Sequence, residues 1–245
     1  MKKILLTAIV ISSMAPSVWA VAYNQNITAI FGGGNPNTGW TTTDADPNGF
    51  QLGLRAKNRD NASTANVNGV YSYTTGYATT SPAPPSPSAR GLWNWEFSIN
   101  SGSSGNLNAT FDYYVAIDTD LSAGTSFVYV NALTGFADNS YGINATGNGQ
   151  GLEGSAAVFA STNNIAQQSQ NIVFYPGQSP LLSGIYTYEL FAVAQGGGVN
   201  GARRAQVDIT VQVNNVPDAG SSLALLGISV AGLVGFSFRK RMLAA

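Results

Sequence analysis

Alternation of apolar and polar side chains is the feature that most limits how this chain can fold. Three segments alternate over eight or more residues: 92–100, 107–118 and 206–213. In the first, Trp93, Trp95, Phe97 and Ile99 fall on one side and Asn94, Glu96, Ser98 and Asn100 on the other. Successive side chains of a strand point to opposite faces, so this period of two predicts half-buried antiparallel strands.

Shorter apolar runs extend the pattern and predict weaker strands at 25–31, 50–57, 67–74, 124–130, 155–160, 170–175 and 184–194. Clusters of Gly, Asn, Asp, Ser and Pro separate these runs, as turns require. No amphipathic helix pattern is evident within 21–216. We therefore predict an all-β fold, an antiparallel β-sandwich of the jelly-roll or Ig-like kind. The Pro-rich segment 81–88 is expected to be a long loop inside this domain rather than a linker, because 21–80 offers only about three strands.

The front of the chain has the order of a secretory signal. Lys2 and Lys3 precede an apolar run at 4–11, and in the following Val18-Trp19-Ala20 the first and third residues are small or short, as signal peptidase requires. The run is too short to span a bilayer, which takes ~17–25 residues. We predict a signal peptide at 1–20, with signal peptidase cutting after Ala20.

The end of the chain has a second membrane signal. An uncharged run covers 222–238, and Arg239, Lys240 and Arg241 follow it directly. A basic cluster after an apolar run predicts a transmembrane helix whose basic end stays in the cytoplasm. The predicted organisation is thus a signal helix at 1–20, a β-sandwich at 21–215 and a tail at 216–245.

This tail resembles the PEP-CTERM class of bacterial sorting signals, most closely the variant that begins Val-Pro-Asp-x-Gly-Ser. The matching residues are Val216, Pro217, Asp218, Gly220 and Ser221, followed by the helix and by Arg239, Lys240 and Arg241. Asp218 stands where the commonest form has Glu followed by Pro. The resemblance implies recognition by a membrane-embedded exosortase, removal of the tail, and delivery to the cell surface or its exopolysaccharide.

Parts of the domain also resemble a group of uncharacterised PEP-CTERM surface proteins. The matching segments are 49–57, 93–100, 112–120, 163–169 and 184–190. This second resemblance implies no activity, because the group has none assigned.

Composition excludes several functions. The chain has no Cys and no His, which removes disulfides, the usual zinc and copper sites, and His-based catalytic triads. Within 21–216, Lys and Arg are fewer than Asp and Glu, so the basic surface of a nucleic-acid-binding protein is missing.

Three sets of residues are candidates for sites. Asp44, Asp46 and Asn48 place oxygen donors at alternate positions before Gly49, like the front half of a calcium loop, although an acidic β-turn explains them more simply. Trp40 and Tyr114 are candidates for stacking on sugar rings, whereas Trp93 and Trp95 share a face with core residues. Glu96 and Glu189 are conceivable glycosidase carboxylates, but both are expected on solvated strand faces.

The sequence therefore predicts an exported surface or exopolysaccharide-associated structural protein that is not an enzyme and needs no cofactor. An inner-membrane intermediate precedes delivery, and the expected partners are signal peptidase, exosortase, the membrane and polysaccharide. A surface carbohydrate-binding module is the alternative.

Overall fold

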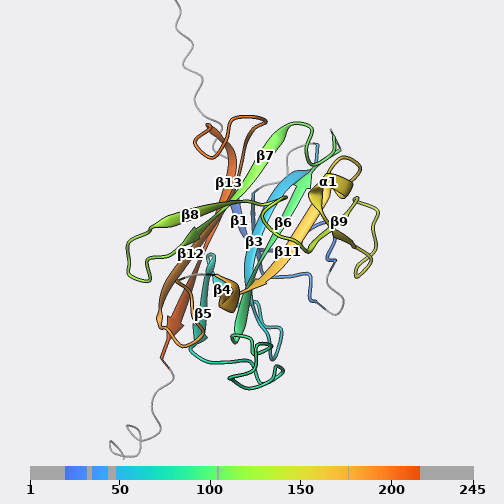
Figure 1. Ribbon diagram of the computed structural model, residues 1–245. Coiled ribbons are helices and arrows are strands. Elements are labelled where there is room, and N and C mark those ends of the chain that lie inside the picture. The colour runs from blue at the N-terminus through green and yellow to red at the C-terminus, as the bar shows by residue number, and fades with distance from the viewer. Residues whose placement is uncertain (1–19, 32–34, 44–47, 104, 176, 216–245) are drawn as a thin grey trace, which may run out of the picture.

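The computed structural model describes residues 20–31, 35–43, 48–103, 105–175 and 177–215, and these form two packed β-sheets (Figure 1). The strands are β1 (Val21–Gln25), β2 (Trp40–Thr43), β3 (Phe50–Asn58), β4 (Asn66–Val67), β5 (Val70–Thr74), β6 (Trp93–Ser101), β7 (Phe111–Asp118), β8 (Phe127–Asn131), β9 (Asn139–Gly142), β10 (Leu152–Gly154), β11 (Ile165–Asn171), β12 (Gly184–Ala194) and β13 (Arg203–Asn214). A one-turn helix α1 (Ala156–Phe159) and a 3-10 turn η1 (Ile172–Phe174) complete the described elements.

The strands divide into two sheets. Sheet A has the order β1-β2-β3-β6-β11-β9-β10, and sheet B has the order β4-β5-β13-β12-β7-β8. Pairing is antiparallel throughout except between β13 and β5, which run parallel. These two strands are far apart in the sequence, so no hairpin fixes their relative direction. The predicted all-β sandwich is confirmed at this level, with one parallel pair that alternation did not predict.

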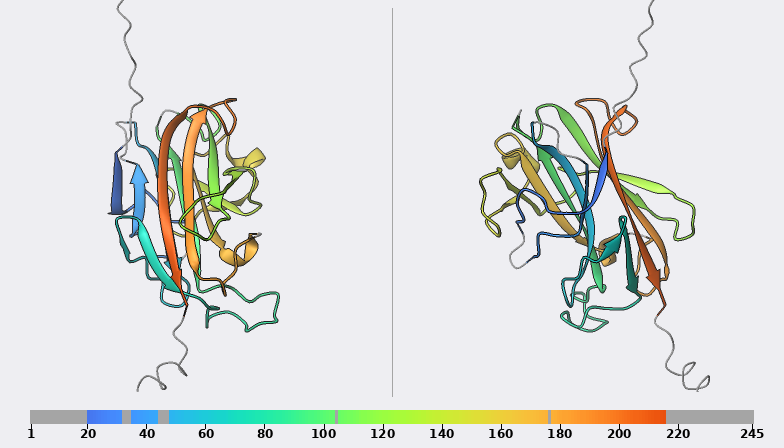
Figure 2. Two further views of the ribbon diagram at one scale, coloured as in Figure 1. Left: turned by 90° about the vertical axis from the view of Figure 1, so that its left-hand side faces the viewer. Right: turned by 180° about the vertical axis from the view of Figure 1, so that it is seen from behind.

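The core lies between the facing sides of the two sheets (Figure 2). On β6, Trp93 and Trp95 are 1% and 0% exposed, as predicted from their shared face. Their rings meet aromatic rings of sheet B: Trp93 lies edge-on to Tyr186 at 5.4 Å, and Trp95 stacks on Tyr188 at 5.0 Å. Since aromatic side chains bury large areas, these cross-sheet contacts hold the layers together without disulfides.

Three predicted strands are wrong. Residues 26–31 leave β1 and cross the outer face of sheet A, because their backbone groups bond side chains instead of a neighbouring strand: the amide of Phe31 donates to Gln167 at 2.9 Å. Residues 156–159 form α1, where the amide of Ala160 donates to the carbonyl of Ala156. Residues 172–174 form η1, and the strand in that region is the more polar segment β11.

The Pro-rich segment is a loop within the sandwich. Tyr77 and Gly91 form a bridge across its base, and the amide of Ala78 donates to the carbonyl of Arg90 at 2.8 Å. The loop therefore leaves and rejoins the structure at one point, at the lower end of Figure 1.

Candidate functional site

The outward face of sheet A carries a buried ion cluster. Arg55 and Lys57 on β3 lie beside Glu96 on β6, because Arg55 and Glu96 are register partners. The Arg55 Nη2 and Lys57 Nζ atoms lie 2.6 and 2.8 Å from the two carboxylate oxygens of Glu96. Arg55 is 0% and Glu96 is 3% exposed. The expectation that Glu96 is solvated is therefore wrong, although it does point away from the core.

The pKa of Glu96 reflects this environment. Burial raises the pKa, but the charges of Arg55 and Lys57 and their hydrogen bonds outweigh burial, so the pKa is lowered. Ser169 on β11 also donates a hydrogen bond to Glu96, at 2.9 Å. With both oxygens engaged and the charge compensated, this carboxylate is poorly suited to act as a general acid or nucleophile.

The described residues 26–31 and 35–38 cover the cluster and are together called the strap here. Arg55 Nη1 donates to the carbonyls of Pro36 and Thr38, at 2.6 and 2.9 Å. Gln167 on β11 donates to the carbonyl of Ala29 at 2.6 Å and accepts from the amide of Phe31 at 2.9 Å. The polar residues of this face therefore bind the strap's backbone. They have a structural role that explains why a polar face is buried.

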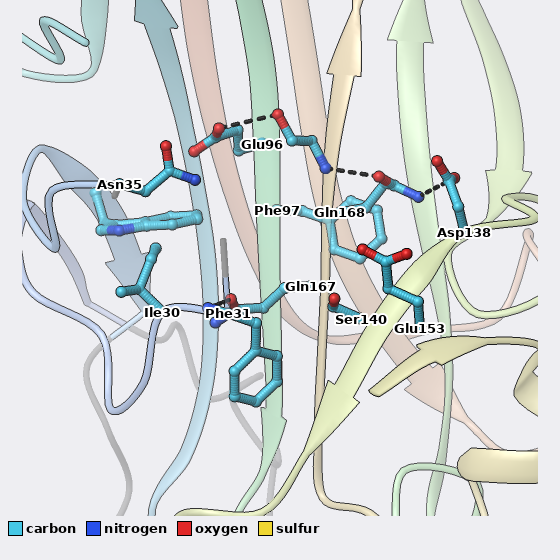
Figure 3. A pocket seen from close by; sticks show the side chains of 12 residues that line it. Ile30, Phe31, Asn35, Glu96, Phe97, Asp138, Ser140, Glu153, Gln167 and Gln168 are labelled. Carbon is cyan, nitrogen blue, oxygen red and sulfur yellow. Dashed lines mark hydrogen bonds between the residues drawn. The ribbon is translucent and has the colours of Figure 1, made fainter. Parts of the chain in front are cut away.

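A pocket of about 180 Å³ remains between the strap and strands β9 and β10 (Figure 3). Ile30 and Phe31 line one side, and the carboxylates of Asp138 and Glu153 lie on the other. Gln168 connects the Glu96 cluster to this rim: its side-chain oxygen accepts from the amide of Ser169 at 2.7 Å, and its nitrogen donates to Asp138 at 2.8 Å. The pocket offers hydrogen-bonding groups to a small polar molecule.

The outward face of sheet B carries an aromatic cluster centred on Phe191 of β12. Tyr114 of β7 stacks on Phe191 with ring centroids 5.7 Å apart, and Tyr129 of β8 meets it edge-on at 6.1 Å. The Arg203 guanidinium lies 4.2 Å from the same ring. Tyr129 is 44% exposed, more than the half-buried Tyr114. The predicted strand at 124–130 includes Tyr129, but its unbroken apolar run Phe127–Val130 does not show which face Tyr129 takes.

The two predicted sugar-stacking residues have different environments. Trp40 is 1% exposed, which corrects its selection as a ligand residue. Its ring packs over Gly53 and under the Arg55 guanidinium, 4.3 Å away, so a glycan cannot reach it. Tyr114 remains a candidate because the residue is only partly buried.

The two Glu residues considered for hydrolysis lie on opposite faces of the sandwich. Glu96 is on the outward face of sheet A, whereas Glu189 is on the outward face of sheet B and pairs with Arg203 at 2.9 Å. They cannot flank one glycosidic bond, which needs carboxyls about 5–10 Å apart.

The predicted calcium residues are only partly described. Asp44 and Asp46 lie outside the described residues, and the Asn48 carbonyl accepts from the amide of Ser103 at 2.7 Å. Among the residues with assigned positions, no group of three or more Asp and Glu side chains is placed to hold a metal ion.

The described sandwich fills the chain between the two predicted terminal signals. The first strand begins at Val21, one residue after the predicted cleavage point at Ala20, and β13 ends at Asn214. The predicted transmembrane helix at 222–238 and the residues of the sorting motif lie outside the described residues. Within 20–215, apart from the gaps given above, no helix is long and apolar enough to span a membrane.

Residues 215–242 match the family described as the VPDSG-CTERM motif. They are a PEP-CTERM-type sorting signal in its VPDSG variant, as Val216, Pro217, Asp218, Gly220 and Ser221 predicted. No curated protein and no solved structure matches the chain. The motif implies that the protein is exported, processed by an exosortase and delivered to the cell surface.

Proposed function

We propose that this chain is a structural or interaction protein of the cell envelope or its exopolysaccharide, and that it is not an enzyme. The observation that supports the proposal is the junction between domain and tail. Strand β13 ends at Asn214, and the VPDSG-CTERM motif begins at residue 215. The sandwich is thus the unit that sorting delivers.

The arrangement of carboxylates favours a role without catalysis. Glu96 is held between Arg55 and Lys57, and Glu189 pairs with Arg203 on the other sheet. Acid–base hydrolysis needs two carboxyl groups that face each other across a cleft and are free to exchange protons, and neither carboxylate is in such a pair. The outward side of sheet A instead uses its polar groups to hold the strap.

Intact mass of the surface protein, with and without the exosortase, tests the proposal. We expect the protein to lack residues 1–20 and the C-terminal tail in the parent cells. Without exosortase, the tail stays attached and the protein stays in the membrane fraction. A tail-bearing protein that reaches the exterior equally well in both strains contradicts sorting by this route.

Carbohydrate binding is a second candidate, favoured by the aromatic cluster on sheet B. Sugar rings stack on exposed aromatic faces, and Tyr114 and Tyr129 lie together on one sheet face. In a polysaccharide pull-down, Tyr114→Ala and Tyr129→Ala should each reduce binding. Tyr23→Ala on edge strand β1, where Tyr23 is 40% exposed, is the matched control and should not. Binding that survives both sheet B substitutions removes this face as the contact.

The proposed function needs no cofactor, and calcium at Asp44, Asp46 and Asn48 is a separate proposal. Thermal unfolding with added calcium and with chelator tests it. A melting temperature that is equal in both conditions removes calcium as a stabilising ligand.

A further inference from the structure

The end of the sandwich where β13 meets the tail carries exposed apolar side chains. Phe174, Leu181 and Leu182 are 53, 61 and 47% exposed. The Arg90 guanidinium lies 4.8 Å from the Phe174 ring. These four residues are called the tail-proximal patch.

Hydrogen bonds place this patch beside the end of β13. The amide of Thr75 donates to the carbonyl of Asn214 at 2.9 Å, and the next amide, of Gly76, donates to the carbonyl of Pro180 at 2.6 Å. Pro180 precedes Leu181 and Leu182 in the chain. Gly91 lies against both Pro180 and Ile172, the first residue of η1, which ends at Phe174. The patch and the tail junction therefore share one end of the domain.

The length of the tail limits how far this end can move from the membrane. Residues 215–222 separate Asn214 from the apolar run that begins at Leu223. Fully extended, these residues span at most about 30 Å. Strand β13 itself has 12 residues and is about 40 Å long, so the linker is shorter than the sandwich. While the tail is attached, the tail-proximal patch lies at the end of the sandwich from which the tail leads to the membrane.

The chemistry of the patch fits a lipid surface. Phe and Leu side chains partition into the boundary between headgroups and acyl chains, and Arg pairs with phosphate headgroups above them. Three apolar side chains bind a membrane weakly alone, but tethering gives a high effective concentration. We infer that the tail-proximal patch docks on the outer surface of the bilayer before the tail is removed, which sets the orientation of the sandwich; this inference rests on the proposed sorting function.

Single labels can test the inference, because the chain has no Cys. The full chain is reconstituted in vesicles of phosphatidylcholine and phosphatidylglycerol, with an environment-sensitive fluorophore on Leu181→Cys or, independently, on Phe174→Cys. Val158→Cys is the matched control, since Val158 in α1 is also 61% exposed. The control lies at the opposite end of the sandwich. The amide of Asn163 donates to the carbonyl of Phe159 at the end of α1, and the amide of Leu107, shortly before β7, donates to the carbonyl of Asn163.

We expect blue-shifted emission and quenching by doxyl-labelled lipid about threefold stronger at position 181 or 174 than at 158, because docking buries the label ~5–10 Å into the boundary. If the chains float with the vesicles but quenching is equal at positions 181, 174 and 158, docking is overturned while the membrane-anchored tail still stands. Chains that fail to float overturn the membrane-anchored tail and docking together. A label that is shielded only when exosortase is added identifies a protein partner instead and also overturns lipid docking. Unchanged intrinsic tryptophan emission shows that each variant is folded.

Discussion

Arg55 and Glu96 form a buried ion pair on the outward face of sheet A, with the Arg55 Nη2 and Nε atoms each 2.6 Å from one carboxylate oxygen. Lys57 approaches the other oxygen at 2.8 Å. Two buried cations therefore depend on one carboxylate. Removing one partner of a buried pair leaves an uncompensated charge, which costs more than the pair itself contributes.

Glu96→Gln should therefore be strongly destabilising. We expect a loss of about 3–5 kcal/mol in the free energy of unfolding, measured in urea by tryptophan fluorescence. Glu189→Gln is the control, since Glu189 pairs with Arg203 at a more exposed position and should cost ~1 kcal/mol or less. Equal losses in the two variants contradict the structural role of the buried cluster.

The same carboxylate predicts how stability changes with pH. The pKa of Glu96 is lowered in the folded protein. The contribution of its ionised carboxylate to the free energy of unfolding is therefore fully present above pH 4.5, the ordinary pKa, and is lost as the pH falls through the pKa of the folded state. Asp60 and Asp120 act in the same direction, because backbone amides hold their pKa values low. We expect the parent to lose more unfolding free energy between pH 6 and acid than Glu96→Gln does. Parallel curves for the two proteins contradict this assignment.

Alternation predicted which side chains share a face but not what covers that face. Glu96, Ser98 and Asn100 do point away from the core, as their period of two indicates. All three are nevertheless buried, at 3, 5 and 4% exposure. The strap comes from a segment far away in the sequence, and its polar contacts with Gln167 leave no periodic signal. The same reason explains the error at Trp40. Its side chain was expected to be exposed because the sequence does not show that Ile27 and Ile30 of the strap pack against it.

The sorting motif was predictable from the sequence, whereas the aromatic cluster on sheet B was not. A motif is a linear string, and Val216, Pro217, Asp218, Gly220 and Ser221 are read directly from the sequence. The aromatic cluster of Tyr114, Tyr129 and Phe191 needs three strands brought into register. The strand predicted at 155–160 was also wrong, because the helix propensity of Ala156 and Ala157 favours the helical turn that forms there.

Two glycines with the same backbone conformation make a matched test of packing. Gly102 and Gly196 have φ angles of +78° and +77°. A Cβ on Gly102 would lie 2.5 Å from the Asn48 carbonyl oxygen and 2.9 Å from the Phe50 amide nitrogen, whereas a Cβ on Gly196 would meet nothing within 4 Å. Gly196→Ala should cost about 1–2 kcal/mol for the left-handed conformation, and Gly102→Ala clearly more. Similar losses in thermal or urea unfolding contradict the close approach of the two backbone segments.

Gln167 should hold the strap in place. Its side chain bonds the carbonyl of Ala29, the amide of Phe31 and the hydroxyl of Ser98. Gln167→Leu leaves these buried groups unsatisfied, at about 1–3 kcal/mol for each. Hydrogen exchange at residues 27–31 should accelerate, while Gln212→Leu on the exposed side of β13 should leave it unchanged. Exchange that is equally slow in both variants contradicts the role of Gln167.

The basic cluster at Arg239, Lys240 and Arg241 should stop the chain in the membrane. The uncharged run ahead of it, 222–238, is short for a ~30 Å core. Each basic residue costs ~2.5–3.5 kcal/mol to move to the bilayer centre, so the cluster fixes its end in the cytoplasm. Replacing all three by Ser or Gln should send full-length, unprocessed protein past the membrane and away from exosortase. Fractionation and intact mass would show this species outside the cell. A triple variant that is retained and trimmed like the parent would mean that Val216-Pro217-Asp218 and the apolar run suffice for sorting.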